Sequence, residues 1–127
     1  MNRTLIIGLV LISVGSVGLD AQEPMNLVNL VQRGDTYLTP ETLVPYSGPA
    51  FSVFPSDSNR IREQGTLRGG TWEGLYESSY FNGQVDSKIE YRDGEFDGSF
   101  ERYYFDGKLL AKGSYSMGVR CGEWIDE

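Results

Sequence analysis

The amino-acid sequence predicts an all-β protein built from tandem antiparallel β-hairpins that form one elongated, twisted sheet. Three observations predict this class. Paired glycines recur at a spacing of 24 residues, two turn-forming dipeptides separate runs of alternating side chains, and aromatic residues make up 13% of the chain. Self-similarity at a fixed period of this length is typical of repeat architectures, in which neighbouring units bury a shared core.

Each unit begins with two glycines four positions apart, and an aromatic residue follows the second glycine by two positions. The glycine pairs are Gly70 and Gly74, Gly94 and Gly98, and Gly118 and Gly122, followed by Tyr76, Phe100 and Trp124. At this period the units cover about residues 67–90, 91–114 and a partial 115–127, after a diverged unit at about 45–66. Glycine adopts backbone conformations that other residues avoid, so we expect the Gly-x-x-x-Gly segments to form the return turns between hairpins.

Turn-forming dipeptides stand in the middle of two units, where Asn82-Gly83 and Asp106-Gly107 separate strand-like runs. Both dipeptides favour two-residue type I′ turns, whose two central residues need positive φ. A hairpin closed at the first dipeptide would pair Tyr80 with Val85, Ser78 with Ser87, and Tyr76 with Ile89. The sequence therefore predicts antiparallel pairing within each unit, in a defined register.

Side chains alternate across a strand, so this register sorts the residues onto two faces of the sheet. One face is mainly aromatic and aliphatic and comprises Tyr76, Tyr80, Val85, Ile89, Phe100, Tyr104 and Leu109. The other face is mainly charged and comprises Glu77, Gln84, Asp86, Lys88, Glu90, Glu101, Lys108 and Lys112. We interpret the aromatic face as the core that the units share, and any uncovered part of it as a candidate binding surface. That surface comprises Tyr76, Tyr80, Phe100, Arg102, Tyr104 and Trp124, with Arg102 expected over a tyrosine ring.

Residues 1–21 have the pattern of a cleavable signal peptide. Arg3 precedes an apolar run from Leu5 to Leu19, and the small residue Ala21 stands at an acceptable cleavage point. A helix of about 15 residues spans about 22 Å, less than the ~30 Å hydrocarbon core of a bilayer. We expect a periplasmic or secreted protein that is cleaved after Ala21, with an uncleaved membrane anchor as the alternative.

Residues 22–44 connect this leader to the repeats. Leu27, Leu30 and Val31 have the spacing of a short helix, whereas the runs 30–32 and 36–38 flank a turn-like Arg-Gly-Asp and would form a hairpin. The sequence leaves both elements open, and we expect the remainder of this segment, residues 39–44, to be a connector.

The composition argues against several classes of function. The formal net charge is −7 and there is no histidine, which disfavours nucleic-acid binding and excludes histidine-based catalysis or metal ligation. Cys121 therefore lacks the histidine partner of a nucleophilic cysteine. Glu77, Asp86 and Glu101 are best explained as parts of a solvated polar face. We expect no enzymatic activity, no cofactor and no metal site.

The glycine pairs, the aromatic residues that follow them and the Asn-Gly or Asp-Gly turns resemble the MORN repeat, in the bacterial variant of the YwqK-type antitoxin group. The segment Pro45-Tyr46-Ser47-Gly48 is similar to the first unit of that group. The resemblance implies a row of hairpins used for protein or membrane contacts. We therefore expect an exported, non-enzymatic module that binds a protein partner. A module for glycans or the cell envelope, or the antitoxin of a toxin–antitoxin pair, are the alternatives.

Overall fold

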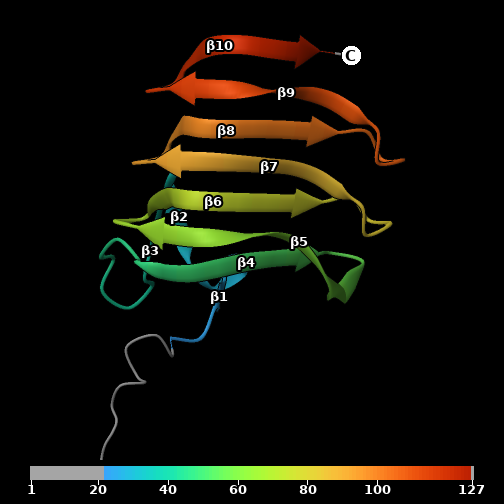
Figure 1. Cartoon of the computed structure of the whole chain (residues 1–127). Coiled ribbons are helices and arrows are strands. Elements are labelled where there is room, and N and C mark those ends of the chain that lie inside the picture. Colours follow the sequence, from blue (N-terminus) through green and yellow to red (C-terminus); the bar gives the residue numbers. More distant parts are fainter. Residues whose placement is uncertain (1–21, 127) are drawn as a thin grey trace, which may run out of the picture.

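The computed structural model describes residues 22–126, and an eight-stranded sheet dominates it (Figure 1). The strands follow one another across the sheet in the order β1-β4-β5-β6-β7-β8-β9-β10. Their bounds are Met25–Asn26 (β1), Gly48–Phe54 (β4), Asp57–Arg68 (β5), Thr71–Ser79 (β6), Val85–Arg92 (β7), Glu95–Tyr103 (β8), Leu109–Ser116 (β9) and Val119–Asp126 (β10). Neighbouring strands from β4 to β10 are antiparallel, so the predicted all-β class of hairpins is confirmed. The predicted signal peptide lies outside the described residues.

The segment before the repeats contains both elements that the sequence left open. A 3₁₀ turn, η2, covers Leu27–Asn29, and a hairpin follows it with strands β2 (Val31–Arg33) and β3 (Thr36–Leu38). This hairpin is a separate two-stranded sheet that lies behind the large sheet in Figure 1, and β1 pairs with β4 in parallel. The prediction of a single antiparallel sheet is therefore incomplete, because the N-terminal segment adds a second layer.

The return turns between hairpins contain the first glycine of each pair, as expected. Asp93 and Gly94 link β7 to β8 with φ values of 52° and 83°, while Met117 and Gly118 link β9 to β10 with φ values of 50° and 84°. Two central residues of positive φ define type I′ turns. The second glycines differ from the expectation, because they lie inside strands at β-bulges. They are Gly74, Gly98 and Gly122, with φ values of 80°, 117° and 68°.

The loops at Asn82-Gly83 and Asp106-Gly107 are not the predicted type I′ turns. In the first loop the Gly83 amide donates to the Tyr80 carbonyl at 2.9 Å, and only Gly83 has positive φ, at 91°. This geometry is a three-residue loop, a type I turn closed by a left-handed glycine. The Asn82 carboxamide oxygen accepts a hydrogen bond from the Gln84 amide at 3.0 Å. This bond stabilises a turn in which Asn82 does not need a positive φ. The Asp106 loop has the same bonds.

The extra loop residue changes the face of two side chains. The predicted pairs of Ser78 with Ser87 and Tyr76 with Ile89 are confirmed, but Val85 pairs with Ser79 and not with Tyr80. Beyond this shift Val85 lines a hollow on the charged face, and Asp86 lies on the aromatic face. The second loop shifts likewise, and Leu109 pairs with Tyr103. A one-residue slip is enough to exchange faces, because side chains alternate along a strand.

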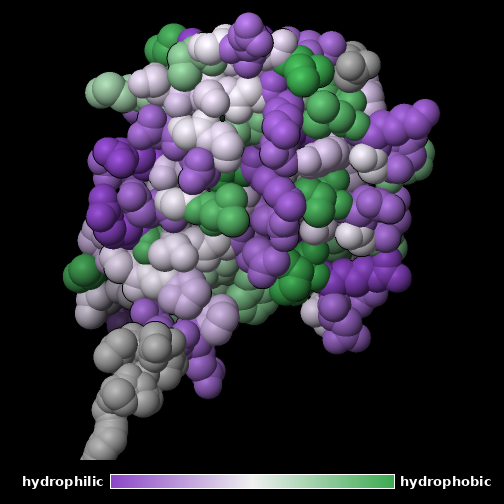
Figure 2. Space-filling view, in the orientation of Figure 1, coloured by the Kyte–Doolittle hydropathy of each residue, from purple (hydrophilic) through white to green (hydrophobic). Residues whose placement is uncertain are grey.

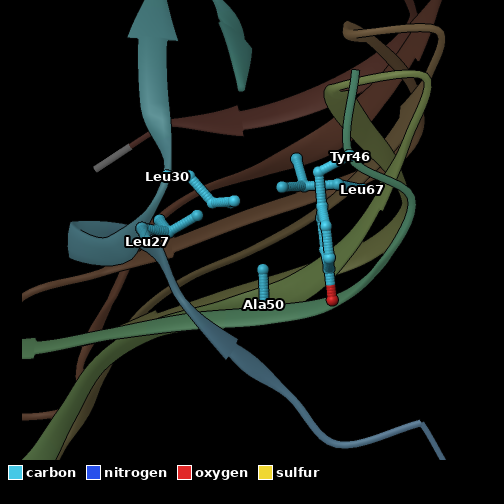
Figure 3. Close-up of a cluster of buried hydrophobic side chains, with 5 residues drawn as sticks. All are labelled: Leu27, Leu30, Tyr46, Ala50 and Leu67. Atoms are coloured by element: carbon cyan, nitrogen blue, oxygen red, sulfur yellow. The ribbon is translucent and has the colours of Figure 1, made fainter. Parts of the chain in front are cut away.

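The hydrophobic core lies between the N-terminal segment and the first strands of the large sheet. It comprises Leu27, Leu30, Tyr46, Ala50 and Leu67 (Figure 3), with Met25, Tyr37 and Trp72 packed against it. Leu67 is 1% exposed, the lowest exposure among these residues. Two main-chain hydrogen bonds join the segment to a return turn, from the Tyr37 amide to the Gly70 carbonyl and from the Gly70 amide to the Tyr46 carbonyl, both 2.8 Å. The N-terminal segment is thus an integral cover of one end of the sheet.

Candidate functional site

A ladder of aromatic rings crosses the face of the sheet that the N-terminal segment covers. It comprises Tyr37, Trp72, Tyr76, Tyr91, Phe96, Phe100, Tyr115 and Trp124, with neighbouring ring centroids 4.9–6.4 Å apart. Most neighbouring rings meet edge to face or tilted, the arrangement that aromatic quadrupoles favour. Apart from Tyr37, which belongs to the N-terminal segment, the rings come from equivalent positions of successive units, so the period of the sequence generates the ladder.

The ladder has two halves. The covered half, over β4 to β6, lies against residues 25–46, and Tyr37 contacts the Trp72 ring there. The open half, over β7 to β10, comprises Tyr91, Phe96, Phe100, Tyr115 and Trp124. Phe100 is buried by its neighbours, whereas the other four rings remain partly exposed. The open half is therefore a continuous, partly exposed aromatic surface.

The open half ends in a cation–π contact on β10. Arg120 stands 24 positions after Phe96, and its guanidinium lies 3.7 Å from the centroid of Trp124. The Trp124 indole also donates to the carbonyls of Ser114 and Cys121, at 3.2 and 3.1 Å. Its ring lies directly over Gly113, where any Cβ atom would collide with it. These contacts fix the last ring of the ladder in place.

A row of polar side chains runs beside the ladder on the same face. Ser52, Glu63, Ser78, Ser87 and Arg102 are paired in register across five neighbouring strands, β4 to β8. Glu63 accepts hydrogen bonds from Ser52 at 2.7 Å and from the Tyr76 phenol at 2.8 Å. Ser78 and Ser87 share a hydrogen bond of 2.6 Å. The face therefore has an aromatic side and a polar side.

A hollow of about 370 Å³ lies where the ladder and the polar row meet. It is lined by Tyr76, Asp86, Ser87, Ile89, Tyr91, Phe96, Phe100 and Arg102. Asp86 Oδ1 lies 3.5 Å from Arg102 Nη2, and no hydrogen bond of standard length and angle reaches this oxygen from the described residues. The hollow thus combines aromatic walls with one pair of opposite charges.

The tyrosines near this hollow are held in their neutral, proton-donating form. Burial raises the pKa of Tyr76, and the hydrogen bond to the Glu63 carboxylate raises it further. Burial and the charge of Glu63 likewise raise the pKa of Tyr91. At the hairpin end of the polar row, burial and then the Asp86 carboxylate raise the pKa of Tyr80, whose phenol donates to the Tyr103 carbonyl at 2.7 Å.

The predicted binding residues do not all lie together. Tyr76, Phe100 and Trp124 are in the ladder, whereas Arg102 lies in the polar row and forms an ion pair with Asp86 in place of the expected ring contact. Tyr80 stands at the hairpin end, and Tyr104 is 41% exposed beside the second loop, outside the ladder. Sequence reasoning missed Tyr91, Phe96 and Tyr115. The signal was available, because aromatic residues recur there at the 24-residue spacing.

The opposite face carries a row of charges, and Figure 2 shows many hydrophilic side chains on it, interspersed with hydrophobic ones. Glu77, Lys88, Glu101 and Lys112 follow one another across four strands in register. Lys88 lies 4.0 Å from Glu77 and Lys112 lies 3.8 Å from Glu101. Glu77 and Glu101 thus lie beside lysines on a polar face, in agreement with the interpretation from the sequence.

Within residues 22–126, no cluster of three or more cysteine or acidic side chains is suited to a metal ion, and no helix is long and apolar enough to span a bilayer. No family model, no curated protein and no solved structure matches this chain.

Proposed function

We propose that this chain is an exported, non-enzymatic module that binds a partner protein through the open half of its aromatic ladder. The observation that carries the proposal is the continuity of the ladder. The same row of rings passes from the covered half, where a polypeptide segment packs on it, to the open half, where the rings are partly exposed. Rigid aromatic side chains of this kind contribute much of the binding energy at protein interfaces.

The covered half indicates what kind of surface the open half would accept. There the leucines Leu27 and Leu30 pack against the sheet, and the segment adds main-chain hydrogen bonds at the return turn of Gly70. The return turns of Gly94 and Gly118 repeat at the same spacing beside the open half. A partner with apolar side chains would match the first feature, whereas the amides of Gly94 and Gly118 already donate within the sheet, to the carbonyls of Trp72 and Phe96.

The absence of a chemical step and the export of the chain rest on the sequence. The chain has no histidine, and the carboxylates of its charged face lie beside lysines. The leader pattern of residues 1–21 supports export. Membership of the MORN repeat group is part of the proposal. Equivalent main-chain bonds support it, since the Gly94 amide donates to Trp72 at 3.0 Å and the Gly118 amide donates to Phe96 at 2.8 Å.

Site-specific photo-crosslinking tests the proposal. The photoreactive residue p-benzoylphenylalanine replaces Tyr115 in the open half in one variant, and Leu75 on the opposite face in the other. Leu75 is 63% exposed, more than the partly exposed Tyr115, so a missing adduct at position 75 could not be explained by poor access. We expect a defined protein adduct from position 115 in the cell envelope, and none from position 75.

The adduct also decides between the alternatives. An envelope protein would support the exported module, and a toxin would place the chain in an antitoxin pair. Equal adducts from both positions, or an adduct from position 75 alone, would contradict the assignment of the open half as the contact surface.

A further inference from the structure

We propose that the hollow beside Asp86 and Arg102 is a binding site for a neutral pyranose ring of a polysaccharide. The site shares Tyr91, Phe96 and Phe100 with the open half of the ladder, leaves Tyr115 and Trp124 outside it, and does not require the protein partner. Its volume of about 370 Å³ is within the range of small-ligand sites, about 300–1,000 Å³.

The ion pair decides which class of ligand fits the hollow. The side chains of Arg102 and Asp86 are 46% and 29% exposed, so a ligand in the hollow would remove both from water. An apolar protein segment would desolvate these charges and offer no hydrogen bonds in return, which is unfavourable.

The ligand must therefore be apolar toward the rings and polar toward the ion pair. Tyr91, Phe96 and Phe100 form the apolar wall, and the two charged groups stand on the other side. A pyranose has both properties, because its C–H groups form apolar patches on the ring faces and its hydroxyls project from the rim. A carboxylate accepts from hydroxyls and a guanidinium donates to them, so Asp86 and Arg102 together can bind neighbouring hydroxyls.

The charges also favour a neutral glycan over an anionic one. Asp86 and Arg102 cancel each other, while the whole chain carries −7. An anionic polysaccharide would be repelled by this net charge. Asp86 Oδ1 is buried and lacks a standard hydrogen bond from the described residues, so it can accept from a hydroxyl of the ligand only after the side chain turns toward the hollow.

Affinity electrophoresis of residues 22–127 tests this site with defined probes. Neutral polysaccharides in the gel would be soluble starch, laminarin, hydroxyethylcellulose and glycol chitosan that has been fully N-acetylated, and polygalacturonate would serve as the anionic control. We expect retardation by at least one neutral glycan and none by polygalacturonate. No retardation by any of the neutral glycans, or retardation by polygalacturonate alone, would overturn the proposal.

Variants then locate the binding. Asp86→Asn together with Arg102→Gln should weaken glycan binding about tenfold or more, because hydrogen bonds to charged groups are the stronger ones. Glu77→Gln together with Lys88→Gln removes a comparable ion pair on the opposite face and should leave binding unchanged. Arg102→Lys keeps the charge that pairs with Asp86, so it tests the site even if the double variant unfolds. It should also weaken binding, since the planar guanidinium is lost.

The outcome is separable from that of the protein-binding proposal. Glycan binding is measured with no partner protein present, and the crosslink from position 115 is scored without a glycan. If glycan binding is equal in wild type and in the folded Asp86 and Arg102 variants, the proposed site is wrong. If these variants lose only the protein adduct and no glycan binds, the hollow belongs to the protein contact.

Discussion

The two halves of the aromatic face start from equivalent repeat positions but differ in what lies over them. Leu67 belongs to the covered half and is 1% exposed under the N-terminal segment. Tyr91 and Tyr115 stand 24 and 48 residues later, and both remain partly exposed. The aliphatic side chain occurs where a second layer excludes water, and the tyrosines occur where the phenol can still reach a polar neighbour or solvent.

This difference gives one end of the sheet a buried core and leaves the other end as the proposed binding surface. The repeat produces the same kind of face in every unit, but only one end of it has a cover formed by residues outside the period. The uncovered units depend on cross-strand ring contacts for their order, with centroid separations of 4.9–5.5 Å between neighbouring rings. Stability and recognition are therefore expected to be concentrated at opposite ends of one sheet.

The largest expected difference between the halves is in the cost of truncating equivalent side chains. Leu67→Ala should lower the free energy of unfolding by about 3 kcal/mol, as large-to-small changes in a buried core do. Tyr115→Ala should cost roughly 1 kcal/mol, because a partly exposed ring loses less buried area. Urea unfolding of residues 22–127 would measure both. Equal losses would contradict the division into a covered and an open half.

A second comparison uses two glycines with almost the same backbone conformation. Gly70 and Gly118 have φ values of 86° and 84°, so alanine would suffer similar backbone strain at both. At Gly70 a Cβ atom would lie 2.5 Å from Thr36 Cγ2 and 2.8 Å from the Tyr37 carbonyl oxygen, whereas at Gly118 the nearest atom is 3.8 Å away, in Glu95. Gly70→Ala should therefore cost roughly 1–3 kcal/mol more than Gly118→Ala, the range for overpacking.

The difference between Gly70→Ala and Gly118→Ala isolates the contact of the Gly70 turn with the N-terminal segment, because the backbone strain is similar in both variants and cancels. Thermal unfolding of the two variants, followed by circular dichroism, would give the comparison. Identical melting temperatures would show that the N-terminal segment does not pack on the Gly70 turn in solution.

The smallest expected effect is a difference in pH dependence at the junction of the halves. Burial and the hydrogen bond to Glu63 raise the pKa of Tyr76, so folded Tyr76 keeps its proton above pH 10, where tyrosines of the unfolded chain ionise. The unfolded state then binds fewer protons than the folded state, and stability falls as pH rises. Between pH 9 and pH 11, the free energy of unfolding should fall by about 1 kcal/mol less in Tyr76→Phe than in the wild type.

Urea unfolding at the two pH values measures this difference for each protein separately. The comparison within each protein removes the constant cost of losing the hydrogen bond from Tyr76 to Glu63. If the free energy of unfolding falls equally in the wild type and in Tyr76→Phe, the pKa of Tyr76 is not raised in the folded protein.

Much of the ladder could be predicted from the sequence, because its positions follow from local rules. The glycine spacing located the return turns, and alternation placed Tyr76 opposite Ile89 on the aromatic face. The face of Asp86 could not be predicted in this way. It depends on whether the loop before it has two or three residues, and Asn82-Gly83 is compatible with both.

The site beside Asp86 was missed for the same reason. The pairing of Asp86 with Arg102 requires the bulge that the three-residue loop creates between β6 and β7. A bulge shifts the register by one residue, which reverses the faces of the side chains beyond it. The sequence pattern contains Arg102 as an exception on the aromatic face, but it contains no sign of the carboxylate that joins it.

The sequence by itself determined the all-β hairpins, the positions of the return turns and the aromatic character of one face. These properties depend on interactions between residues close in the chain, through glycine conformations and the alternation of side chains. The tertiary structure alone decided which end of that face is covered. Leu27 and Leu30 reach Leu67 only when segments about 40 residues apart pack together. The hydrophobic effect that drives this contact is non-directional, so a local sequence pattern does not specify which segments will meet.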